Sequence, residues 1–134
     1  MGSEMCIRDR CVSIGVATKD EIDELNIHNA TLLSMRRAVN NLSIKPDIIY
    51  FDGLYVPDLN IESHAIVKGD NKIREISAAS IIAKVARDNE MTHLNKKFMN
   101  YGFINNKGYG TRQHMYAITC FGKTIHHRES FLKL

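Results

Sequence analysis

Two aspartates, each beside a glycine at the end of a short apolar segment, are the residues best suited to chemistry. Asp52 follows the run 47–51 and precedes Gly53, while Asp70 follows Gly69 and the run 64–67. Consecutive strands are usually neighbours, and open α/β sheets build sites at the carboxyl ends of their strands. Close carboxylates repel unless cations neutralise them, and hard oxygen ligands suit Mg²⁺ or Mn²⁺. Because Asp-Gly is also a common turn pair, the residues alone leave a metal site and two ordinary turns both open.

A second candidate is the glycine-rich segment that runs from Lys107 through Gly108 and Tyr109 to Gly110. Free amides, a cation and an aromatic ring on one loop suit contact with phosphates and stacking on sugars or bases. A plain glycine loop is the alternative. The adjacent pair His126-His127 could hold a metal, but a solvated basic tail is the preferred interpretation. No nucleophile elbow, phosphate-binding P-loop or HExxH sequence occurs, so serine hydrolases, P-loop nucleotide hydrolases and zinc proteases have no support.

Composition sets the broad class. The 134 residues suit one domain with a modest core, and no apolar run approaches the ~20 residues of a membrane helix. Eighteen basic against fifteen acidic residues give a net charge of +3, which is compatible with a nucleic-acid partner. Three cysteines without a CxxC pair indicate reduced thiols, so we predict a cytoplasmic protein with no membrane partner.

The elements that must position these residues follow from local patterns. Residues 1–10 have the character of a foreign leader, and residues 11–134 are taken as the domain. Apolar segments predict parallel strands at 11–17, 47–51 and 64–67, with the second buried on both faces. A capping box of Thr18 and Glu21 starts a helix that is interrupted near Asn26.

A helix at 75–88 is expected to pack on these strands through a face of small residues. That face consists of Ala78, Ala79, Ser80, Ala83 and Ala86 with Ile82 and Val85. Met91, Leu94 and Phe98 extend the pattern, and a last helix is predicted from the cap Thr111 to about Gly122.

Several motifs in one order resemble bacterial ribonuclease HII. They are EIDELNIHNATLLSMRRAV, IIYFDG, AIVKGD, EISAASIIAKVARD, YGFINNKGYGTRQH and HHRESF, and they span about residues 12–131. The resemblance implies a ribonuclease H-like α/β fold with parallel core strands and packed helices. It also implies metal-dependent endonucleolytic cleavage of RNA in RNA–DNA hybrids, including single ribonucleotides in duplex DNA, with 5′-phosphate and 3′-hydroxyl products.

The resemblance assigns roles to particular residues. Asp52 and Asp70 correspond to two of the four acids that hold two Mn²⁺ or Mg²⁺ ions in the family. Tyr109 corresponds to the tyrosine at the junction between ribonucleotide and deoxyribonucleotide. Lys68, Lys84, Lys107 and Arg128 are expected to contact the phosphates of the hybrid.

One departure from the family pattern matters. The first strand of the family carries Asp-Glu-Ala-Gly-Arg-Gly, which is absent from this sequence; Glu4 and Asp9 do not replace its acids. We therefore expect an N-terminally truncated, monomeric ribonuclease H-like domain whose two-metal site is incomplete. The alternative function is that of a catalytically inactive fragment with residual nucleic-acid binding.

Overall fold

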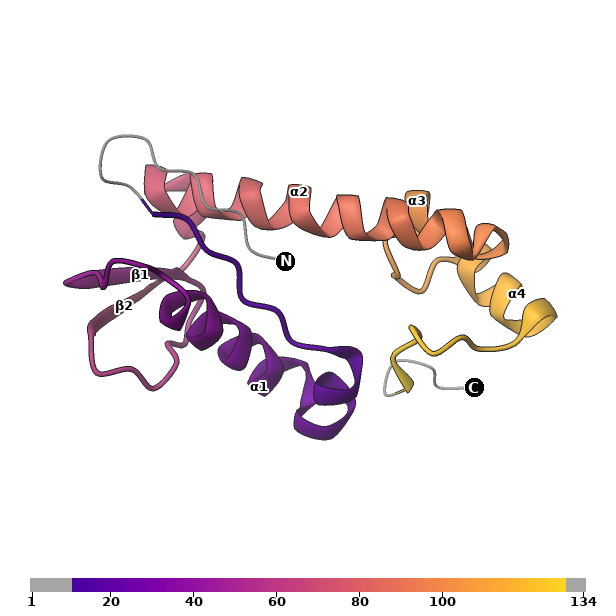
Figure 1. Cartoon of the computed structure of the whole chain (residues 1–134), viewed down its shortest axis with the longest axis horizontal. Coiled ribbons are helices and arrows are strands. Elements are labelled where there is room, and N and C mark those ends of the chain that lie inside the picture. The colour runs from indigo at the N-terminus through magenta and orange to yellow at the C-terminus, as the bar shows by residue number, and fades with distance from the viewer. Residues whose placement is uncertain (1–10, 130–134) are drawn as a thin grey trace. The chain divides into compact units, whose positions relative to one another are not determined.

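The computed structural model describes residues 11–129, which form two units, one up to Ala79 and one from Ser80 onward (Figure 1). The proposed leader, with Glu4 and Asp9, lies outside the described residues. The first unit contains α1 (Lys19–Asn40), β1 (Ile48–Asp52), β2 (Glu62–Ile66) and the 3-10 turn η1 (Gly69–Asn71). α2 (Arg74–Lys97) runs from the first unit into the second, which also contains η2 (Met99–Tyr101), α3 (Phe103–Asn106) and α4 (Arg112–Phe121).

The helix α1 begins as its sequence predicts. The Thr18 hydroxyl accepts from the Glu21 amide at 3.3 Å, and the Glu21 carboxylate accepts from the Thr18 amide at 2.8 Å. Asn26 has φ 70° and ψ 167°, so the predicted interruption is a kink inside the helix. The Arg37 guanidinium donates to both Glu21 carboxylate oxygens, at 2.7 and 2.5 Å. The ion pair between Arg37 and Glu21 links the last turn of α1 to its first turn.

The predicted strand at 11–17 is wrong. Residues 11–18 have no regular secondary structure, and the sheet in the described part of the chain holds only β1 and β2. A β-propensity becomes a strand only where a neighbouring backbone supplies a ladder of hydrogen bonds. Here side chains at the C-terminal end of α1 take that place: Arg37 donates to the Val16 carbonyl at 2.8 Å, and the C-cap residue Asn41 donates to the Ile14 carbonyl at 3.4 Å. No strand therefore precedes α1 in the described residues, and the predicted parallel pairing of residues 11–17 does not form.

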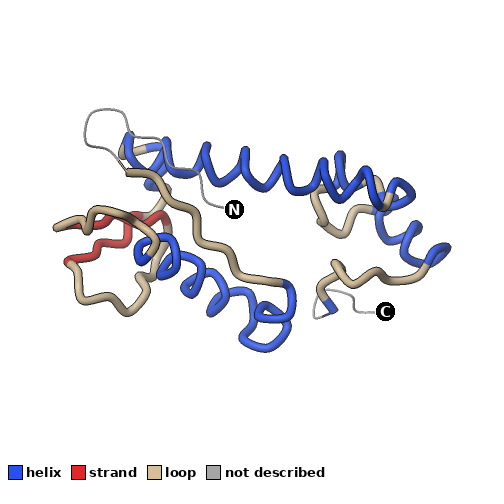
Figure 2. Tube along the Cα trace, in the orientation of Figure 1, coloured by secondary structure: helices blue, strands red, loops and turns tan. Residues whose placement is uncertain are grey.

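The predicted parallel pair is confirmed. β1 and β2 pair in parallel from Ile48 opposite Glu62 to Asp52 opposite Ile66 (Figure 2, red). The second strand begins two residues earlier than its apolar pattern predicts. The expectation that β1 is covered on both faces is wrong, because only Phe51 is buried, while Ile48 and Tyr50 are 44% and 45% exposed. An apolar run indicates a preference for burial, whereas burial itself depends on layers elsewhere in the molecule.

The two predicted helical segments at 75–98 form one helix, α2. Its face of small residues is not buried as expected. Ala78, Ala79, Ser80 and Ala83 are exposed, Val85 is 53% exposed, and only Ile82 and Ala86 are half-buried. Small side chains permit another element to approach closely, but they do not ensure that such an element is present. The pattern therefore could not predict whether this face is buried. The prediction that this helix packs on the strands stays a prediction.

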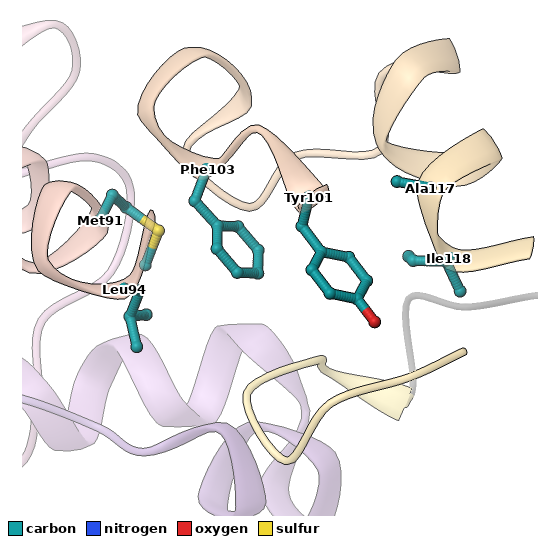
Figure 3. Packing of buried hydrophobic residues seen from close by; sticks show 6 residues of the cluster. All are labelled: Met91, Leu94, Tyr101, Phe103, Ala117 and Ile118. Atoms are coloured by element: carbon teal, nitrogen blue, oxygen red, sulfur yellow. The ribbon is translucent and has the colours of Figure 1, made fainter. Parts of the chain in front are cut away.

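The second unit has its own core, shown in Figure 3. Its buried residues are Met91, Leu94, Tyr101, Phe103, Ala117 and Ile118. The rings of Tyr101 and Phe103 stack with centroids 5.7 Å apart. The predicted last helix is confirmed, with the Thr111 hydroxyl accepting from the His114 amide and the helix ending before Gly122. The core therefore lies directly beside the loop 107–110.

His127 corrects the expectation of a solvated tail. Its side chain is only 5% exposed and stacks on His114 with ring centroids 5.1 Å apart. Its Nδ1 accepts from the Thr124 amide at 2.9 Å, while the buried Nε2 has no partner among residues 11–129. Desolvation, followed by the electrostatic interaction with His114, lowers the pKa of His127, which favours the neutral form of the ring.

None of the helices in residues 11–129 combines the length and the apolar character that crossing a membrane requires.

Candidate functional site

Asp52 is the last residue of β1, so the strand itself determines its place. It lies opposite Ile66 in the parallel register, and the pairing continues through the Gly53 amide, which donates to the Ile66 carbonyl at 3.0 Å. The side chain is exposed at the carboxyl edge of the pair. This is the edge at which the sequence predicted a site.

Asp70 lies in the turn that follows β2. Lys68 enters this turn in the left-handed conformation with φ 54°, and the Gly69 carbonyl accepts from the amides of Lys72 and Ile73 at 3.0 and 2.8 Å. The Gly69 amide donates to Asp52 Oδ1 at 2.8 Å. Covalent geometry then limits the distance from Asp52 Oδ1 to the Asp70 Cα to about 8 Å. The structure therefore places the Asp70 backbone within about 8 Å of the Asp52 carboxylate, at the same edge of the strand pair.

The donor atoms at this place suit a hard divalent cation. Asp52 uses one carboxylate oxygen for the Gly69 amide, and Asp70 has no hydrogen bond or ion pair within residues 11–129. Carboxylate oxygens are the ligands that Mg²⁺ and Mn²⁺ prefer. Across the same residues no three or more His, Cys, Asp or Glu side chains gather into a group that could hold a metal. The chemistry of the ligands fits, but the described chain contributes two acids.

The predicted loop from Lys107 to Gly110 belongs to the second unit and is built on a buried asparagine. Asn106 Oδ1 accepts from the Gly108 amide at 2.8 Å, and its Nδ2 donates to the Tyr101 carbonyl at 2.6 Å. These bonds hold the turn in which Lys107 and Gly108 have φ 51° and 82°. The Tyr109 side chain remains 71% exposed, so its ring is available for stacking.

The four predicted cations differ in their surroundings. Lys68 and Lys84 are exposed. Lys107 Nζ lies 3.7 Å from Asp88 Oδ1, a partly exposed pair that holds the side chain only weakly. Arg128 is half-buried, with Nη2 3.5 Å from the Gly108 carbonyl. Lys68 shares the unit of the two aspartates, whereas Lys84, Lys107, Arg128 and Tyr109 belong to the other.

Comparison with known proteins decides the family. The family model of ribonuclease HII matches residues 5–133. The chain belongs to the ribonuclease HII family. It is 55% identical over 120 residues to the ribonuclease HII of Shewanella halifaxensis (strain HAW-EB4), an alignment that covers 90% of this chain and 59% of that relative.

A solved structure supports the fold of this ribonuclease HII chain. The ribonuclease H2 from Pyrococcus horikoshii OT3 is similar to it with a TM-score of 0.62 and 28% sequence identity, over 86% of this chain and 62% of that one. The predicted ribonuclease H-like α/β fold is thus confirmed. The chain spans less than two thirds of the length of both relatives.

The sequence analysis did not identify the buried polar residues beside the loop 107–110 of this ribonuclease HII chain. Asn106, His114 and His127 are each at most 7% exposed, and Asn106 Nδ2 lies 3.1 Å from His114 Nδ1. The spacing of Asn106 and His114 gave no periodic signal. The only local hint was an Asn two residues before a glycine, an arrangement that can cap a left-handed turn.

Proposed function

We propose that this chain supplies part of a metal-dependent endoribonuclease that cleaves RNA in RNA–DNA hybrids, including single ribonucleotides in duplex DNA. The observation that carries the proposal is the hydrogen bond from the Gly69 amide to Asp52 Oδ1. It links the ends of two parallel strands so that both aspartates share one edge. The match to ribonuclease HII over residues 5–133 supplies the reaction class.

In the proposed mechanism Asp52 and Asp70 hold divalent cations with their unpaired oxygens. A pair of such ions, when bound, polarises the attacking water and stabilises the leaving 3′ oxygen. The aspartates orient this arrangement, and the fixed Asp52 carboxylate keeps one oxygen directed at the Gly69 amide. Water attacks phosphorus in line, the bond from phosphorus to the 3′ oxygen breaks, and that oxygen takes up a proton. The products carry 5′-phosphate and 3′-hydroxyl ends.

The remaining residues are proposed to bind the substrate. Tyr109 stacks at the junction between ribonucleotide and deoxyribonucleotide, which its exposed ring permits. Lys68, Lys84, Lys107 and Arg128 contact phosphates, and such contacts position the duplex without reading its sequence.

We further propose that the 134-residue chain alone is inactive. Two carboxylates give two ions about half the protein charge that the family site contains, and Mg²⁺ needs enough oxygen ligands to remain localised. The second candidate function, binding of hybrid duplexes without cleavage, is favoured by the same shortage of acids and by the net charge of +3. Such binding would weaken steeply with salt, because phosphate contacts dominate it.

The test compares this chain with a longer one that restores the family's Asp-Glu-Ala-Gly-Arg-Gly strand. Each is incubated with a duplex that contains one ribonucleotide, in Mn²⁺ or Mg²⁺. We expect cleavage only by the longer chain, and its loss in Asp52→Asn but not in the matched control Asp58→Asn, an exposed aspartate in the loop between β1 and β2.

Two results would contradict these proposals. Hydrolysis by the 134-residue chain that Asp52→Asn abolishes would disprove its inactivity. A longer chain that folds and binds the duplex without cutting it would refute the assigned reaction.

A further inference from the structure

The turn between β2 and α2 fixes the Asp52 carboxylate through a single backbone group. Asp52 is exposed, and an exposed aspartate at the end of a strand is free to change rotamer. Its Oδ1 accepts the Gly69 amide at 2.8 Å, and the structure gives this carboxylate no other hydrogen bond within residues 11–129. The direction of the second oxygen, which is the one left for a cation, therefore depends on where the Gly69 amide lies.

The place of that amide is in turn set by close packing. Gly69 is buried, and a Cβ built on it would lie 2.6 Å from Ile76 Cδ1, a distance that real Cβ atoms essentially never show. Ile76 belongs to the first turns of α2 and is only 5% exposed. The next nearest atoms to that Cβ, Ile66 Cβ and Ile76 Cγ2, lie at 3.4 and 3.5 Å. One methyl group, Ile76 Cδ1, accounts for the severe overlap.

The backbone conformation does not itself require glycine at this position. The glycines with positive φ are 53, 102, 108 and 122, and Gly69 is not among them. An alanine at 69 could therefore adopt the same backbone angles if it had room. The need for glycine comes from the contact with Ile76, which can be relieved by a second substitution.

We propose that Gly69 is a positioning residue for the metal site. Its contact with Ile76 fixes the position of the Gly69 amide, and this amide orients the Asp52 carboxylate. This inference rests on the proposed function, because it treats Asp52 as a ligand. A Cβ at 69 would overlap Ile76 Cδ1, and because Ile76 is only 5% exposed, close packing leaves this methyl group little space to turn into. The turn would therefore move away from α2 and carry the amide away from Asp52 Oδ1. Groups that orient a metal ligand typically change metal affinity ~10–100-fold when they are removed.

The test measures binding of Mn²⁺ alone to the longer chain that restores the family's Asp-Glu-Ala-Gly-Arg-Gly strand, with free Mn²⁺ followed by electron paramagnetic resonance. The variants are Gly69→Ala, Ile76→Val, their combination and Asp52→Asn. We expect Gly69→Ala to weaken binding about tenfold or more. The combined variant should return to within about twofold of Ile76→Val, because valine lacks Cδ1 and leaves only ordinary contacts. Circular dichroism of each variant separates a positioning role from a merely structural one, because a positioning role predicts weaker binding in a Gly69→Ala variant that remains folded.

A second measurement needs no metal. Hydrogen exchange at the Gly69 amide should become about tenfold faster in Asp52→Ala, because the amide loses its acceptor, a change that corresponds to one net hydrogen bond. Exchange at the Ile73 amide, which donates to the Gly69 carbonyl within the turn, serves as the control and should not change.

The outcomes separate the two proposals. If Gly69→Ala binds Mn²⁺ as the parent does while Asp52→Asn binds weakly, the metal site stands and the positioning role is refuted. If Asp52→Asn binds as the parent longer chain does, or that parent binds no Mn²⁺, the proposed metal site fails and the inference fails with it. A combined variant that remains as weak as Gly69→Ala, or that does not fold by circular dichroism, also overturns the role assigned to Ile76. Unchanged exchange at Gly69 in Asp52→Ala overturns the hydrogen bond itself.

Discussion

Replacement of Asn106 by leucine tests how the candidate substrate loop is held. The side chain is 7% exposed and connects three groups: the Tyr101 carbonyl, the Gly108 amide and the His114 ring. Leucine has the same branching at Cγ, so it occupies the same space but offers no hydrogen bond. The substitution therefore isolates the polar contribution from the packing contribution.

The magnitude follows from the groups that lose a partner. An unpaired buried donor or acceptor costs about 1–3 kcal/mol, and both the Tyr101 carbonyl and the Gly108 amide lose Asn106. His114 relieves part of this cost, because its Nδ1 lies 3.2 Å from the same Tyr101 carbonyl and can donate in the other tautomer. We expect the second unit to lose about 2–4 kcal/mol of unfolding free energy.

Urea unfolding followed by circular dichroism gives this free energy, and hydrogen exchange locates the loss. The Gly108 and Tyr109 amides should exchange faster than in the parent chain. Asn105→Leu is the matched control, since it makes the same change on an exposed neighbour in α3 and should stay within about 0.5 kcal/mol of the parent. Equal stability of Asn106→Leu and the parent, or an equal loss in Asn105→Leu, would refute the reasoning.

Three further outcomes follow from the described side chains. In an active longer chain, Tyr109→Ala should slow cleavage at isolated ribonucleotides with unchanged Mn²⁺ affinity, whereas Tyr116→Ala, equally exposed at 72%, should change neither. Hydrogen bonds from Arg37 and then from the Thr18 amide lower the pKa of Glu21 to about 2. Its stabilisation of α1 is thus present above pH 4.5 and lost as pH falls toward 2, and acid titration of Glu21→Gln by circular dichroism should lack that loss. Burial lowers the pKa of His127, so the second unit should lose stability as pH falls below about 6.5, because the unfolded chain binds the proton more readily than the folded chain does. Urea unfolding of His127→Phe should show a weaker dependence on pH.

Local signals explain what could be predicted. The capping box at Thr18 and Glu21, the cap at Thr111 and the stop at Gly122 each depend on residues within one helical turn. They form wherever the helix forms, whatever the rest of the chain does. The parallel pairing of β1 and β2 was also predictable, because consecutive strands are usually neighbours.

The failures concern contacts between residues that are distant in sequence. Residues 11–17 have the composition of a strand, but no strand in the described chain pairs with them. The strand order alone was enough to predict that Asp52 and Asp70 lie at one edge. No sequence pattern predicts the hydrogen bond from the Gly69 amide to Asp52. Backbone groups are the same in every residue, so composition cannot indicate which of them will hold a side chain. Asn106 was missed for a related reason, since its partners are mostly backbone groups.

Two lysines have a left-handed backbone conformation, so replacing them by glycine would raise stability but remove positive charge. Lys68 and Lys107 have φ 54° and 51°, a region that costs a residue with a side chain roughly 1 kcal/mol relative to glycine. An engineer who seeks a more heat-resistant protein would replace both with glycine and would gain at both turns. The same replacements would remove one cation next to Asp70 and another next to Tyr109. A screen that rewards melting temperature alone would therefore select against two of the cations proposed to contact phosphate, and it should be paired with a binding screen.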